Sequence, residues 1–156
     1  MQKVLLIDSD LESIGGLAEV LRGAGIACAL TGDGREGLEF AQDQQPSLIV
    51  LCVELNRVSG YSICNKLKKN SDLADIPLIL TSTEASQADF DQHRRLNTRA
   101  EGYLFKPYDL PTVLGLMGGL IDLPAEVQER ALQVTPPPSP VADDEDLDVS
   151  IEVDAA

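Results

Sequence analysis

The stretch Ser47-Leu48-Ile49-Val50-Leu51-Cys52-Val53 decides the fold of this 156-residue chain. Short and almost continuously apolar runs of this kind are typical of strands that a parallel sheet buries on both faces. Similar runs occupy residues 4–7, 26–30, 78–81 and 103–105, and helical patterns lie between them. Five strands that alternate with helices require parallel pairing and right-handed crossovers. The sequence therefore predicts an α/β fold built from five strand–helix units.

The helical segments continue this pattern, and they are expected at residues 11–22, 35–42, 60–69 and 110–120. Asp10 and Asp109 can cap the first and the last of these, and Gly23 can end the first. The expected topology is the flavodoxin-like (βα)5 doubly wound parallel sheet, with strand order 2-1-3-4-5. Its functional crevice lies at the carboxyl ends of strands 1 and 3. Asp8, Ser9 and Cys52 follow or end those strands.

Composition excludes several classes of function. A net charge of −14 argues against nucleic-acid binding, which needs clustered Lys and Arg. No apolar stretch is long enough to span a bilayer, and there is no signal peptide, so we expect no membrane insertion. The cysteines Cys28, Cys52 and Cys64 have no C-x-x-C spacing, which indicates reduced thiols in a cytoplasmic protein.

The composition changes after Pro124, where we place the boundary between a folded body (1–124) and a disordered Pro-rich and acidic tail or linker (125–156). Residues 125–132 carry a short helical pattern, and a Pro-rich stretch follows. Seven acids and no base lie from residue 131 onward. Such a segment cannot bury enough apolar surface to fold alone. It is either a solubilising tail or a docking segment whose alternating residues 149–153 add a strand to a partner's sheet.

Several residues of the body fit one family. Lys106-Pro107 follows the fifth strand, a hydroxyl (Ser82, or Thr81) ends the fourth, and Tyr103 occupies the fifth strand. With Asp8 after the first strand, residues 1–123 resemble the receiver domain of bacterial response regulators. The resemblance implies that Lys106 contacts a phosphoryl group, that its bond to proline is cis, and that Tyr103 is the switch aromatic.

Two departures from the family change the chemistry. The acceptor aspartate is replaced by Cys52, and the second acid of the strand-1 pair by Ser9. A thiol cannot form an aspartyl phosphate, and magnesium prefers oxygen ligands that these residues no longer supply. We therefore expect a degenerate phosphorylation pocket of Asp8, Ser9, Cys52, Glu54, Ser82 and Lys106, with no metal, no cofactor and no enzymatic activity. Lys106 is expected to pair with Asp8 instead.

A narrower resemblance is carried by residues 60–69, 92–96 and 103–107, which are similar to the N-terminal pseudo-receiver domains of myxobacterial motility proteins of the FrzS and AglZ type. It implies a phosphorylation-independent protein-interaction module for signalling or for polar localisation of motility machinery, cytoplasmic and recruited to a cell pole. Two alternatives stay open. One is a response regulator phosphorylated on Glu54 or Asp8. The other is a redox switch, in which Lys106 lowers the pKa of the Cys52 thiol; an inert buried Cys52 is the competing interpretation.

A partner surface is expected on the helix between the fourth and fifth strands (helix 4), the fifth strand, and the helix at residues 110–120 (helix 5). Its predicted residues are His93, Arg94, Arg95, Tyr103 and Tyr108. Arg94, Arg95 and Arg99 form a basic cluster on an acidic protein, either a docking patch for an acidic partner or an ordinary solvated helix face. His93 is either solvated or paired with Tyr103. The acidic tail can compete for the same patch, or can itself be the docking segment.

Overall fold

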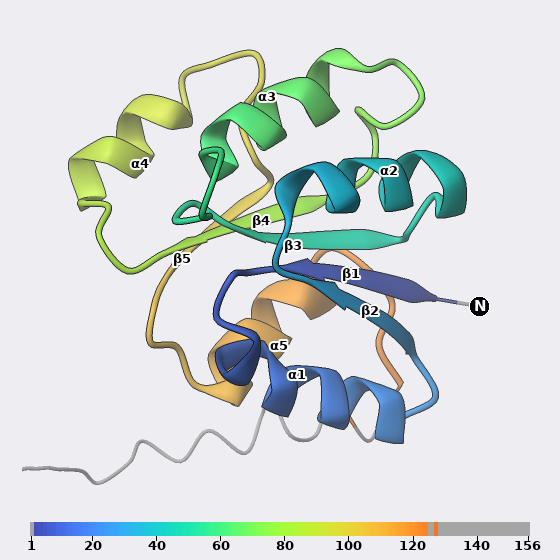
Figure 1. The fold of residues 1–156 in the computed structure, drawn as a ribbon. Coiled ribbons are helices and arrows are strands. Elements are labelled where there is room, and N and C mark those ends of the chain that lie inside the picture. Colours follow the sequence, from blue (N-terminus) through green and yellow to red (C-terminus); the bar gives the residue numbers. More distant parts are fainter. Residues whose placement is uncertain (1, 125–126, 128–156) are drawn as a thin grey trace, which may run out of the picture.

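The computed structural model describes residues 2–124 and 127, which form a five-stranded parallel sheet with helices on both faces (Figure 1). The strands are β1 (Lys3–Ile7), β2 (Ala27–Thr31), β3 (Leu48–Cys52), β4 (Leu78–Ser82) and β5 (Gly102–Phe105). The helices are α1 (Leu11–Gly23), α2 (Gly34–Gln44), α3 (Gly60–Lys69), α4 (Gln87–His93) and α5 (Leu110–Gly118). The order is β2-β1-β3-β4-β5, and every pair is parallel. The predicted flavodoxin-like fold is confirmed.

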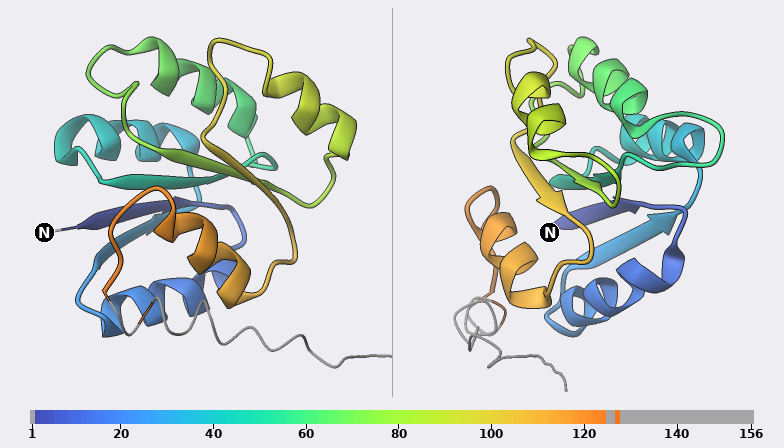
Figure 2. Two further views of the ribbon diagram at one scale, coloured as in Figure 1. Left: turned by 180° about the vertical axis from the view of Figure 1, so that it is seen from behind. Right: turned by 90° about the vertical axis from the view of Figure 1, so that its left-hand side faces the viewer.

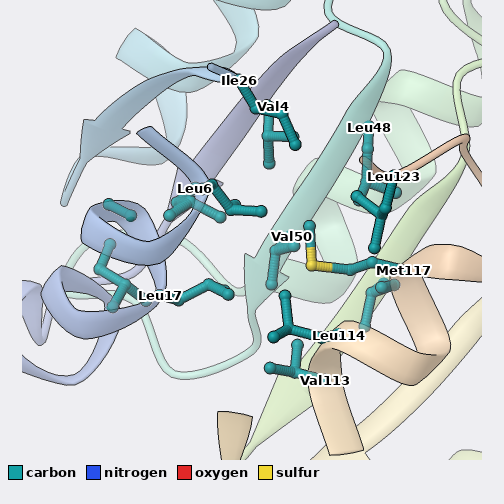
Figure 3. Close-up of a cluster of buried hydrophobic side chains, with 14 of the residues drawn as sticks. Val4, Leu6, Leu17, Ile26, Leu48, Val50, Val113, Leu114, Met117 and Leu123 are labelled. Carbon is teal, nitrogen blue, oxygen red and sulfur yellow. The ribbon is translucent and has the colours of Figure 1, made fainter. Parts of the chain in front are cut away.

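The strands are continuously apolar because both faces of the sheet are covered. Val4 and Leu6 of β1 belong to one buried cluster, and Leu5 and Ile7 to another. This alternation is the period of two that a strand imposes on its side chains. The first cluster is shown in Figure 3, where Met117 of α5 packs beside the strands.

The two clusters correspond to two helical layers. Helices α1 and α5 lie on one face of the sheet, and α2, α3 and α4 lie on the other (Figures 1 and 2). β5 forms one edge of the sheet, so α4 and α5 flank that edge from opposite sides. Loops follow the carboxyl ends of the strands, and several buried polar residues lie there.

The predicted caps are confirmed, while element ends differ from the predictions by one or two residues. The carboxylate of Asp10 accepts the N–H of Ser13, and that of Asp109 accepts the N–H of Thr112. The expected stop, Gly23, is instead the last residue of α1. Gly25 turns the chain with φ 86°, and its N–H bonds back to the carbonyl of residue 22 while the next N–H reaches residue 21. That pair of bonds is a Schellman motif, which needs a glycine one position beyond the cap.

The fourth helix, α4, ends before most of the predicted cluster of arginines. α4 ends at His93, and Arg94 is its C-cap, so Arg95 and Arg99 lie in the turns that lead to β5 rather than on a helix face. Among the described residues, no helix has the length and apolar character needed to cross a membrane. The predicted acidic tail, and the helical pattern at 125–132 apart from Val127, lie outside the described residues.

Candidate functional site

The predicted crevice is present at the carboxyl ends of β1, β3 and β4. Asp8 follows β1, Cys52 is the last residue of β3, and Ser82 is the last of β4. The strand register places Cys52 beside Thr81, and Lys106 enters from the chain after β5. Asp8, Cys52 and Ser82 are at most 2% exposed. Buried polar side chains require hydrogen-bond or ion-pair partners. The partners of these three residues define the site.

Asp8 and Lys106 form the expected ion pair. Lys106 Nζ lies 2.7 Å from Asp8 Oδ2, and both side chains are almost fully buried. Asp8 Oδ1 accepts the N–H of Asp10 at 2.9 Å. Burial works against the charge of Lys106, but the hydrogen bond to Asp8 and the neighbouring Cys52 outweigh it, so the pKa of Lys106 is raised. Lys106 is therefore charged at neutral pH, and its ammonium group lies directly against the Asp8 carboxylate.

The Cys52 thiol remains protonated at neutral pH. Burial, reinforced by Asp8, raises its pKa to about 11, although Lys106 works in the opposite direction. The contacts of Sγ are long, 3.7 Å to Glu54 Oε1 and 3.9 Å to Lys106 Nζ. Lys106 acts to lower this pKa, as one interpretation expected, but the net shift is upward because desolvation of the thiolate outweighs the effect of the lysine.

Glu54 reaches the crevice through its side chain. Its carboxylate accepts hydrogen bonds from the Ser82 hydroxyl and from the Thr83 N–H, the latter at 2.8 Å. Burial alone would raise the pKa of Glu54, but these donors and the Glu84 N–H lower it below its usual value. The carboxylate thus fills an anion-binding pocket made by the end of β4. The sequence analysis placed Glu54 near the crevice but missed the Thr83 N–H, because a backbone donor leaves no mark in a sequence.

The donor set does not fit a magnesium ion. Asp8 is the one carboxylate at the centre of the crevice, and Lys106 already neutralises it. Cys52 offers sulfur, and the Ser9 hydroxyl donates to the Glu54 backbone carbonyl at 3.1 Å. Within residues 2–124 and 127, no group of three or more His, Cys, Asp or Glu side chains comes together as a metal site. Magnesium needs several oxygens in near-octahedral geometry, which these side chains do not offer.

His93 and Tyr103 form the second half of the site, at the far end of the β4–β5 segment. His93 Nδ1 lies 2.6 Å from the Tyr103 hydroxyl, which also accepts the N–H of Ala100 at 3.0 Å. Because the hydroxyl oxygen accepts this N–H, the hydroxyl can donate its own proton to Nδ1. Nδ1 can accept that hydrogen bond only when the imidazole ring is neutral. Burial lowers the pKa of His93, in agreement with a neutral ring. The predicted His93–Tyr103 pair is present, and His93 is not solvated.

Aromatic rings that the sequence analysis did not select hold this pair in place. Phe90 of α4 packs against Tyr103 with ring centroids 5.0 Å apart, and Tyr61 of α3 lies 5.1 Å from the His93 ring. The Arg94 guanidinium stacks over the Tyr103 ring at 4.6 Å. Phe90 gave no signal beyond that of a core residue, since apolar spacing cannot say which ring touches a functional side chain.

Comparison with known proteins agrees with this geometry, because the family model of the response regulator receiver domain matches residues 4–116. The chain belongs to the response regulator receiver domain family. Its receiver fold keeps the lysine after β5, joined to Pro107 by a cis peptide bond.

Two curated proteins illustrate the range of receivers that this chain is similar to. Adventurous-gliding motility protein Z of Myxococcus xanthus is 30% identical over 146 residues, which cover 89% of this chain and 10% of that protein. The DNA-binding dual master transcriptional regulator RpaA of Synechocystis is 33% identical over 123 residues, covering 78% of this chain and 49% of that protein. The chain therefore spans about half or less of the length of these relatives.

Solved receiver structures share the fold. The chemotaxis protein CheY4 of Vibrio cholerae aligns with a TM-score of 0.70 at 25% identity, covering 78% of this chain and 99% of that one. The signal receiver domain of a putative Luxo repressor protein from Vibrio parahaemolyticus also gives 0.70, at 18% identity and with 84% and 95% coverage. The second likeness shows the fold alone.

The structure separates the residues predicted to bind partners into two groups. Arg94, Arg95 and part of Tyr103 are accessible on the receiver surface beside β5. His93 is 7% exposed, and Tyr108 packs against the α1/α5 cluster with its hydroxyl buried and without a partner among the described residues. Neither of these two presents a free polar group to a partner. Phe105, 41% exposed at the end of β5, was not predicted.

Proposed function

We propose that this receiver is a phosphorylation-independent protein-interaction module, a pseudo-receiver that works in signalling or in polar localisation of motility machinery. In this view it is not an enzyme, it is cytoplasmic, and it is recruited to a cell pole by a protein partner. Residues 1–124 form the module, and residues 125–156 act as its tail or linker. The similarity to Adventurous-gliding motility protein Z supports the motility setting.

One observation carries the proposal. The chain's own charged side chains fill the centre of the crevice and use the hydrogen-bond donors there. Lys106 pairs with Asp8, and the Glu54 carboxylate takes the Ser82 hydroxyl and the Thr83 N–H. A receiver with an acceptor aspartate would need these groups for magnesium and a phosphoryl group. Here a protonated thiol stands at the acceptor position, so a phosphoryl group would have neither a nucleophile nor free donors.

The two alternatives are less well supported. Phosphorylation of Glu54 or Asp8 would require each carboxylate to leave charge-assisted hydrogen bonds, which are stronger than neutral ones. A redox switch at Cys52 would require a thiolate and access to oxidant, while this thiol has a pKa of about 11 and is 2% exposed. Buried thiols of this kind are usually inert.

Acetyl phosphate with magnesium, followed by intact-mass analysis, tests the proposal. We expect no phosphoryl adduct on the wild-type chain and no rise in Tm with magnesium and beryllofluoride, because a ligand stabilises a fold only by binding it. The variant Ser9→Asp/Cys52→Asp is the positive control for the chemistry, since it restores both missing acids. An adduct on wild-type Glu54 or Asp8 would favour the phosphorylated switch, and a sulfenic acid on Cys52 after mild peroxide would favour the redox switch.

We further propose that the partner binds the surface where α4 meets β5, and that the contacting part of the partner is acidic. Arg94, Arg95 and Arg99 are exposed there on a chain of net charge −14, which would steer a negative group to this spot. Phe105 adds exposed aromatic surface at the sheet edge, and aromatic and arginine side chains dominate interface hot spots. Tyr103 is fixed below Arg94, so the surface is preformed.

Charge reversal tests this surface. Arg94→Glu/Arg95→Glu in the full chain should abolish partner capture while the Tm holds. Lys66→Glu/Lys69→Glu is the matched control, because it reverses two exposed charges on α3. If the control abolishes capture equally, the effect is one of net charge. If only removal of residues 141–156 abolishes it, the acidic tail is the docking segment and this surface is not the site.

A further inference from the structure

A second cavity of about 600 Å³ lies beside the crevice. Two of the helices that border it, α2 and α3, cover the same face of the sheet (Figure 1). Its walls come from the loops after β1, β2 and β3, the start of α2 and one side of α3. Open α/β sheets bind ligands outside the carboxyl ends of their strands, next to the point where the strand order reverses. In this chain that point lies between β1 and β3. The volume is within the usual range for small-molecule sites, about 300–1,000 Å³.

The cavity is lined by three basic side chains that lack an acidic partner. Arg35, Arg57 and Lys66 are all exposed, and none of them makes an ion pair with a described residue. Such a gathering is unusual on a chain with 26 acids and 12 bases. With Asp33 and Glu36 also in the wall, bases outnumber acids in the lining by three to two, and low-dielectric walls focus the field of the charges that line a cavity.

The two acids in the wall offset part of this positive charge, but their carboxylates already have hydrogen-bond partners. The Asp33 carboxylate accepts the N–H groups of Arg35 and Glu36 at the start of α2. The Glu36 carboxylate accepts the Thr31 hydroxyl at 2.6 Å. Both acids thus serve the local fold, whereas the guanidinium groups of Arg35 and Arg57 keep their donors for a ligand.

The remaining wall is apolar and comes from Leu55, Val58 and the buried Ile63. A bare inorganic anion would gain nothing from that wall, whereas an anion that carries a ring would cover it. Two guanidinium forks and an ammonium suit phosphate, which accepts bidentate bonds from arginine. We infer that this cavity binds an organic phosphate of about the size of a mononucleotide. The cavity borders the phosphorylation crevice, because Ser9 lines it, but its three bases lie outside that crevice. A phosphoryl adduct on the chain and AMP binding by the wild-type chain are separate measurements, so the two proposals can fail independently.

Calorimetric titration of the full chain with AMP, in EDTA, tests the inference. Saturable binding is expected, with a Kd below about 1 mM. Arg57→Ala/Lys66→Ala should weaken it by about tenfold or more, since a charged hydrogen bond is worth at least that factor. The matched control Lys69→Ala/Arg95→Ala removes two exposed positive charges outside the cavity and should leave the Kd within about twofold. Val58→Asp, which puts an acid into the apolar wall, should also weaken AMP binding, and it should lower the Tm because Val58 packs against the core.

Three results would overturn the inference. Absence of saturable AMP binding up to about 10 mM would remove the site, since such affinity is below that of functional ligands. Equal binding of inorganic phosphate would show that the apolar wall contributes nothing. Equal loss in the Lys69/Arg95 control would show that net charge, and not the cavity, attracts the nucleotide.

Discussion

Replacing Glu54 with alanine should destabilise the fold, because it takes away the acceptor of two donors at the end of β4. The Ser82 hydroxyl is fully buried and donates to one carboxylate oxygen, and the Thr83 N–H donates to the other. A hydrogen bond to a charged acceptor contributes roughly 1.5–3 kcal/mol, and water replaces part of that at a half-buried group. We therefore expect a loss of about 2 kcal/mol in the free energy of unfolding, or about 8 °C in Tm.

Thermal unfolding at neutral pH measures this loss. Glu54→Gln should fall between wild type and Glu54→Ala, because an amide oxygen still accepts one hydrogen bond without the charge. The matched control is Glu39→Ala. Glu39 is an exposed α2 residue whose side chain makes no hydrogen bond or ion pair with any described residue. If Glu54→Ala costs no more than Glu39→Ala, the carboxylate does not stabilise the end of β4 and the reasoning is refuted.

A rescue experiment separates the loss of an anion from the loss of packing. In Glu54→Ala the Ser82 hydroxyl and the Thr83 N–H form an open pocket for an anion, so formate or phosphate should raise the Tm of the variant with increasing concentration. The same salts should leave the wild-type Tm nearly unchanged relative to chloride. A parallel response of both proteins would indicate a general salt effect.

The pH dependence has a defined sign. The pKa of Glu54 is lower in the folded state than in the unfolded chain, since its hydrogen bonds outweigh burial. A depressed carboxyl pKa gives stability that is present above the unfolded value and is lost as pH falls through the folded value. The Tm difference between wild type and Glu54→Gln should therefore be full at neutral pH and disappear in acid.

Three further predictions concern the rest of the site. Burial lowers the pKa of His93, the single histidine of the chain, so the unfolded state takes up the proton first; Tm should fall from about pH 7.5 to 5.5, and less so in His93→Gln. Cys52 should resist thiol reagents in the native protein and react fully after denaturation, and Cys52→Ala should cost about 1 kcal/mol or less in unfolding measurements. Cys52→Asp should lower the Tm in EDTA, because its carboxylate repels Asp8, and adding Ser9→Asp should let magnesium recover the loss; an unchanged Tm in Cys52→Asp would contradict this.

The strand order and the helical layers could be predicted because their signals are strong and local. Runs such as residues 47–53 are apolar on both faces only when helices cover both sides of a sheet, and the parallel connections then restrict the topology. The exact end of α4 could not be predicted, since the arginines after His93 continue the sequence pattern of a helix without adding a buried face. Gly23 was predicted as the stop of α1 for a similar reason: the sequence shows a glycine but not its backbone angle, and the positive φ belongs to Gly25.

The arrangement of the crevice residues could be predicted where it depends only on their positions along the strands. Asp8 and Cys52 had to meet because the carboxyl ends of β1 and β3 are neighbours, and Lys106 then had one buried acid to neutralise. The sequence could not decide between physical effects that act in opposite directions on one group. The sign of the Cys52 pKa shift depends on burial against charge, and Tyr108 turned inward because loop residues have no periodicity that fixes their direction.

Both ends of the β4–β5 segment are tied by contacts that need no phosphate. At its start, the Glu54 carboxylate holds Ser82 and Thr83; at its end, His93 and the Ala100 N–H hold the Tyr103 hydroxyl. A segment that is hydrogen-bonded at both ends has to break one of these sets of bonds before that end can move, and hydrogen bonds in partly buried networks are costly to break. The surface between α4 and β5 thus inherits one shape from the crevice and from the aromatic cluster. A receiver without the acceptor aspartate can still present a defined surface for this reason, and the proposed partner would bind a surface that the chain's own carboxylate and imidazole hold in place.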